Sequence, residues 1–96
     1  MKDVPVSFPG NEIVTAGLVD LAEGCESEAS LLVSMAAPRL RALGFAVPTS
    51  GHERPSHRLY ELIAERDDGG AHSRYNALVA RMVSFARAAE RDAAAG

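Results

Sequence analysis

The chain has 96 residues, 47% of them hydrophobic, and a formal net charge of −3 at pH 7. This length indicates one domain with a single small core, and the acidic balance gives no reason to expect a nucleic-acid partner. The lone cysteine, Cys25, excludes an internal disulfide. No apolar run is long enough for a membrane span, and the opening residues MKDVPVSFPG lack the apolar segment of a signal peptide. We therefore expect a cytoplasmic protein.

Residues 1–9 contain two prolines and no helical period, which predicts an extended N-terminal arm. The apolar residues of the arm alternate along the chain: Val4, Val6 and Phe8. Because alternation is the period of a strand, the arm is expected to lie on the bundle, or on a partner, as a short strand.

A first helix is predicted over 11–23, where apolar residues recur at the helical period. Asn11 is expected to cap its start, and Gly24 to follow its end in the left-handed conformation. Gly17 falls on the apolar face of this helix. A glycine there indicates a close crossing with another helix.

A second helix is predicted over 27–43, with Ser27 as its N-cap. Pro38 is expected to kink it, because proline cannot donate the hydrogen bond that the Ser34 carbonyl would accept. Gly44 should end it in a left-handed cap, with Phe45 folding back onto the last turn.

Two more helices are predicted over 55–66 and 71–93, separated by a break at Gly69-Gly70. Apolar residues of the last helix are spaced alternately by four and three, as in a coiled-coil seam. This seam comprises Ala71, Tyr75, Leu78, Met82, Phe85 and Ala89, and it is widened by Val79, Val83 and Ala86. The sequence therefore predicts one all-α domain over 1–96, a small four-helix bundle with a kinked second helix, a long C-terminal helix and an N-terminal arm.

Arg66 and His72 flank the glycine break. An arginine and a histidine with five residues between them resemble the short motif of HEPN-domain RNases, which are helical bundles. The resemblance implies that Arg66 stabilises a phosphorane-like anion and that His72 moves a proton. The alternative is that both are solvated residues of a turn. Gly69-Gly70 favours the turn, because it places the pair across a loop rather than on one rigid helix.

Other candidate chemistry is sparse. The three histidines, His52, His57 and His72, form no metal-ligand motif, so we expect no metal and no cofactor. Cys25 lies between two glutamates that oppose a reactive thiolate, so it is not expected to be a nucleophile.

The arginines of the last helix follow two stripes. Arg74 and Arg81 are seven residues apart and share a face, whereas Arg87 and Arg91 are four apart. We interpret these stripes as a solvated face or as part of a protein interface. Phosphate binding is the least favoured interpretation, because no aromatic residues or helix-turn-helix spacing accompany them.

The segments ESEASLLVSMAAPRLRALGF and AHSRYNALVARMVSFARAAE, with the chain's size and helical layout, resemble the small helical antitoxin partners of nucleotidyltransferase-like toxins from actinobacteria. This resemblance implies a non-catalytic protein that binds and neutralises a cognate toxin. Alternatives are the HEPN-like RNase and a plain homodimeric bundle. If the seam is open, the residues expected to contact a partner are Arg74, Tyr75, Arg81, Met82 and Phe85, with Val4, Val6 and Phe8 of the arm.

Overall fold

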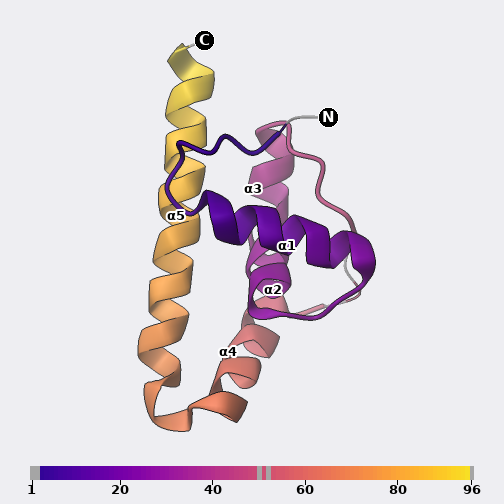
Figure 1. The fold of residues 1–96 in the computed structure, drawn as a ribbon, viewed down its shortest axis with the longest axis vertical. Helices are drawn as coiled ribbons and strands as arrows, with labels where there is room; N and C mark the ends of the chain where they lie inside the picture. Colours follow the sequence, from indigo (N-terminus) through magenta and orange to yellow (C-terminus); the bar gives the residue numbers. More distant parts are fainter. Residues whose placement is uncertain (1–2, 50, 52, 96) are drawn as a thin grey trace.

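The computed structural model describes residues 3–49, 51 and 53–95, which form helices and connecting loops. The elements are α1 (Asn11–Glu23), α2 (Glu28–Met35), α3 (Ala37–Ala42), α4 (Pro55–Arg66), the 3-10 turn η1 (Asp68–Gly70) and α5 (Ala71–Ala95). Helix α5 runs along the long axis of the molecule, and α1 crosses in front of α2 and α3 (Figure 1). The predicted all-α class is confirmed. The described part of the chain has five α-helices, however, so the predicted count of four is wrong.

Helix α1 begins and ends at glycines. Gly10, with φ of 78°, occupies the N-cap position in place of the predicted Asn11. The Asn11 amide instead donates to the carbonyl oxygens of Val6 (3.0 Å) and Phe8 (2.8 Å), which ties the arm to the helix. Gly24, with φ of 74°, ends α1 as predicted. The left-handed conformation at both ends needs glycine, because a side chain would clash with its own backbone there.

Helices α1 and α2 pack against each other through Gly17, as the sequence predicted. A Cβ at this position would collide with the Ala29 carbonyl oxygen and the Val33 side chain. The short connection between the two helices is fixed by Ser27, whose hydroxyl accepts from the Ser30 N–H at 3.0 Å. The same hydroxyl donates to the Asp20 carboxylate of α1 at 2.6 Å. Ser27 is therefore both the predicted cap of α2 and a link between the two helices.

The predicted second helix is broken rather than kinked. Helix α2 ends at Met35, and Ala36 has a non-helical backbone with φ of −94° and ψ of 4°. The reason is Pro38, which has no N–H for the Ser34 carbonyl and suits the first turn of a new helix. Helix α3 ends at Ala42, and Gly44 follows its C-cap, Leu43, with φ of 97°. The Phe45 N–H returns to the Leu40 carbonyl at 3.1 Å, which confirms the predicted cap.

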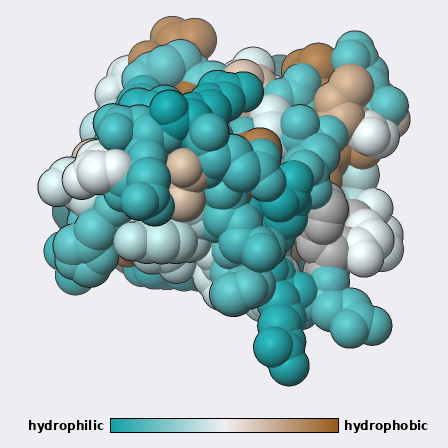
Figure 2. All heavy atoms as spheres, turned by 90° about the horizontal axis from the view of Figure 1, so that it is seen from below, coloured by the Kyte–Doolittle hydropathy of each residue, from teal (hydrophilic) through white to brown (hydrophobic). Residues whose placement is uncertain are grey.

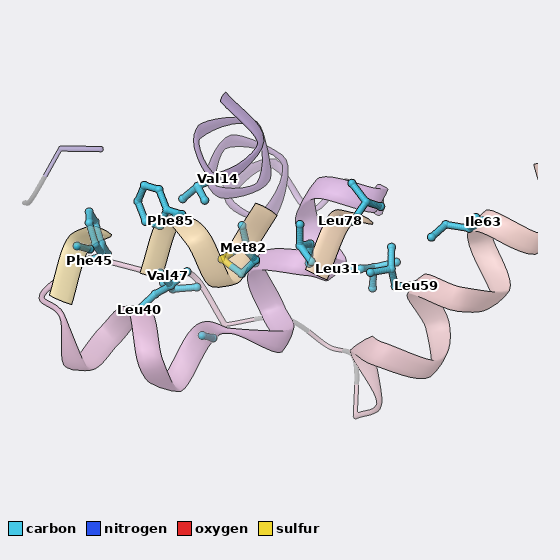
Figure 3. Close-up of a cluster of buried hydrophobic side chains, with 14 of the residues drawn as sticks. Val14, Leu31, Leu40, Phe45, Val47, Leu59, Ile63, Leu78, Met82 and Phe85 are labelled. Atoms are coloured by element: carbon cyan, nitrogen blue, oxygen red, sulfur yellow. The ribbon is translucent and has the colours of Figure 1, made fainter. Parts of the chain in front are cut away.

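The core lies between α5 and the other helices. Figure 3 shows Leu40, Phe45 and Phe85 toward one end of it, and Leu59 and Ile63 toward the other. Phe85 is fully buried, and its ring lies 5.6 Å from that of Phe45. Outside this core, the lower end of the molecule is largely hydrophilic (Figure 2).

The N-terminal arm lies on the bundle and contains turns rather than a strand in its described residues. The Phe8 N–H donates to the Pro5 carbonyl at 3.2 Å, which closes a turn that the alternating pattern did not predict. The Phe8 ring packs edge-on against Phe85, with centroids 5.7 Å apart. Val4 also packs on the core, whereas Val6 is 88% exposed. Only one of the three apolar arm residues therefore remains available to a partner in this conformation.

Candidate functional site

Arg66 and His72 form hydrogen bonds with different residues. Arg66 ends α4, and its Nη1 donates to the Glu28 carboxylate at 3.2 Å. His72 lies in the first turn of α5, with its Nε2 3.2 Å from the Asn76 side-chain amide. RNase chemistry requires an arginine and a histidine that meet at one phosphodiester. These hydrogen bonds do not join the two side chains, and they give Arg66 the role of an ion-pair partner.

Arginine–glutamate ion pairs connect the helices. The pairs are Glu12–Arg81, Glu26–Arg58, Glu28–Arg66, Glu28–Arg74 and Arg39–Glu90. The Glu28 side chain is only 12% exposed, and it accepts from both Arg66 and Arg74, which brings the start of α2 against α4 and α5. Because Arg74 and Arg81 each face a carboxylate, the stripe that these two arginines form on α5 is not an uncompensated phosphate-binding surface.

Two of the residues expected to contact a partner belong to the core. Phe85 is fully buried and Met82 is 5% exposed, so the seam is closed at these positions. It is closed because the rings of Phe8 and Phe45 pack on Phe85, and Gly10 lies beside it. Tyr75 is only half-buried, and its ring meets that of Tyr60 of α4 edge-on at 5.7 Å. Arg74 and Arg81 are about half exposed and are engaged with Glu28 and Glu12. A role for these two arginines and Tyr75 in partner binding remains a prediction.

An apolar groove lies beside the closed seam, between the α2–α3 break and α5. Its volume is about 230 Å³. The groove is lined by Leu32, Met35, Ala36, Arg39, Val79, Met82, Val83 and Ala86. Val79, Val83 and Ala86 are the residues that widened the seam in the sequence, so the pattern contained a signal for one wall. The other wall could not be predicted, since it depends on how α2 lies against α5.

Charged side chains mark one end of the groove. The Arg39 guanidinium donates from Nε and Nη2 to the two Glu90 carboxylate oxygens, at 2.8 and 2.7 Å. This bidentate hydrogen bond lowers the pKa of Glu90 and raises the pKa of Arg39. Arg87 lowers the pKa of Glu90 further through its charge. Two guanidinium groups therefore act on one carboxylate, and these three side chains together are net positive.

The remaining candidates do not converge. No group of three or more potential metal ligands occurs within the described residues. His57 lies near Glu61 on the surface of α4, and His52 is outside the described residues. Cys25 is an exposed free thiol. In the part of the chain that the structure describes, no helix has the length and apolar character that a membrane crossing requires.

The fold and the groove define an all-α protein with an open apolar face. Neither the family models, the curated proteins nor the solved structures with which the chain was compared gave a match.

Proposed function

We propose that this chain is a non-catalytic protein-binding module that uses the groove between α2–α3 and α5 to hold a partner. The observation that carries this proposal is the open apolar wall of Met35, Val79 and Val83. Apolar surface left open beside a closed core is a common mark of a docking site. Three residues along this side of the molecule are of types that are enriched in protein interfaces. They are Tyr75, Met35 and Arg39.

The specific role that we propose is a cytoplasmic antitoxin that binds and neutralises a nucleotidyltransferase-like toxin. Its support is the resemblance of residues 26–45 and 71–90 to the antitoxin partners of such toxins. The groove adds a surface on which a toxin can be held. Arg66 and His72 have other partners in the fold, and we therefore place the RNase alternative second.

The test is to express the tagged chain in its host organism and to identify the protein that co-purifies with it in stoichiometric amount. We expect a protein that arrests growth when it is expressed alone and is inactive in the complex. Co-expression of the wild-type chain should restore growth. A chain that purifies alone as a stable dimer would contradict the proposal and support the homodimeric bundle. RNA cleavage that is lost in His72→Ala would support the RNase.

A further inference from the structure

We infer that the groove receives a single amphipathic helix of the partner, and that this helix carries a carboxylate beside its apolar stripe. The inference rests on the proposed function, which it deepens by giving the chemistry of the segment that is bound. Its grounds are the placement of the groove on α5, the composition of its walls and the charge at its end.

The groove lies on the side of α5 away from the N-cap of α1. Arg81 and Val83 are two residues apart in one helix, which places them about 200° apart around its axis. On the Arg81 side, the start of α1 packs so closely that a Cβ on Gly10 would lie 2.9 Å from the Arg81 carbonyl oxygen. On the Val83 side, α5 forms the groove with α2. The N-cap of α1 thus touches α5 on one side, and the groove lies on the other.

The walls of the groove fit an apolar helix better than a small polar ligand. They come from α2, the start of α3 and α5, so a helix laid between them would contact both walls at once. Met35 contributes a flexible side chain that adapts to a partner's shape. Tyr75 lies one turn before Val79 on the same face, and its contact with Tyr60 extends the apolar surface toward α4.

The charge at the end of the groove determines which charged side chains the docked helix carries beside its apolar stripe. Arg39 and Arg87 together carry two positive charges against the single negative charge of Glu90, so these three side chains have a net charge of one positive unit. Arg87 is exposed beside the groove wall, one turn after Val83. A carboxylate on the docked helix would therefore be attracted there, and a lysine or arginine would be repelled. Charge of this kind sets the orientation and the choice of partner more than the total affinity.

The test uses the full isotopically labelled chain and two synthetic helical peptides of about 18 residues, or five turns. The peptides share one stripe of leucines, and they differ only in having glutamates or lysines along its flank. We expect the acidic peptide to shift the backbone amide signals of Ala36, Val79 and Val83. We expect it to bind at least about tenfold more tightly than the basic peptide, which corresponds to about 1.4 kcal/mol. Arg87→Glu, at an exposed position that tolerates substitution, should reduce or reverse this preference.

A matched pair of variants locates the site. Val83→Glu places a charge in the groove wall and should abolish peptide binding, whereas Ser84→Glu places it on the other side of α5 and should leave binding unchanged. Circular dichroism establishes that each variant is folded, and Val79→Glu provides a second groove variant. Equal binding of the two peptides, shifts at residues outside the groove, or no binding would each overturn the inference. A dimer of the chain alone that dissociates in Val83→Glu would also overturn it, because the occupant would then be a second copy.

Different results would refute the proposed function and the proposed occupant of the groove. A toxin that is neutralised equally well by the wild-type chain and by Val83→Glu would refute the groove as the docking site and leave the proposed function intact. Selective binding of the acidic peptide, with no neutralised toxin in the host, would refute the proposed function and leave the groove intact.

Discussion

Gly17 of α1 lies directly against the carbonyl oxygen of Ala29 of α2, with no room for a side chain between the two helices. We expect Gly17→Ala to destabilise the fold. Alanine favours a helix over glycine by about 1 kcal/mol. The steric clash should outweigh this gain, because forcing extra atoms into a packed contact costs about 1–3 kcal/mol. The free energy of unfolding in urea measures the difference.

Gly51→Ala is the control for this substitution. Gly51 lies in the loop before α4, and a Cβ there would have no atom within 4 Å. The free energy of unfolding of the Gly51→Ala variant should equal or slightly exceed that of the wild type, because alanine lowers the entropy of the unfolded chain. A stability gain in Gly17→Ala as large as in Gly51→Ala would show that the crossing is looser than described.

Ser27→Ala should lower the stability by about 1–2 kcal/mol. It removes the hydroxyl that caps the Ser30 N–H of α2 and that donates to Asp20 of α1. Ser73→Ala, at an exposed position of α5, should stay within about 0.5 kcal/mol of the wild type. Thermal unfolding of the two variants side by side distinguishes them, and equal midpoints would contradict a capping role.

Glu28→Gln should lower the stability by about 1 kcal/mol at low salt, and by less at high salt. The Glu28 carboxylate holds Arg66 and Arg74, and it also lies in the first turn of α2, where the helix dipole favours a negative charge. Urea titrations in low and high sodium chloride measure the salt dependence. Glu23→Gln, at the exposed end of α1, should show no comparable loss.

The ion pair between Arg39 and Glu90 should be visible in a pH titration. Because the hydrogen bond from Arg39 lowers the pKa of Glu90 in the folded protein, its contribution to stability is fully present above the ordinary value of 4.5. The contribution is lost as the pH falls through the lowered folded value. Carbon-13 NMR should show that Arg39→Gln moves the pKa of Glu90 back toward 4.5, and that Arg87→Gln moves it less. A pKa of Glu90 that is the same in Arg39→Gln and in the wild type would refute this assignment.

Local signals in the sequence predicted the ends of most helices. Gly24, Ser27 and Gly44 each act through hydrogen bonds to residues a few positions away, so their neighbours in the sequence suffice to place them. Asn11 was assigned wrongly, because the residue that caps α1 is decided by how Gly10 lies against α5. The break at Pro38 was expected only as a kink, since both outcomes follow from the same missing N–H.

The candidate site was harder to predict, because its residues meet through contacts between segments that are far apart in the sequence. Glu28 and Arg74 are 46 residues apart, and no periodicity connects them. The seam of α5 was visible, but its pattern does not distinguish positions that face the core from those that face a partner. Phe85 proved to be core and Val83 proved to be groove wall, and the difference depends on where the arm and α2 lie around α5.

The contact between the arm and α5 also has a consequence for the nascent chain. Helices α1 and α2 pair through neighbouring segments, so they can associate early in synthesis. Arg81 meets Glu12 across 69 residues, and Phe8 and Phe45 find their common ring partner only when Phe85 has been made. Until then a ribosome-bound chain exposes both aromatic rings, and a chain interrupted within α5 keeps them exposed. Truncated products of this protein are therefore expected to be recognised by chaperones and proteases rather than to persist as a shorter stable fold.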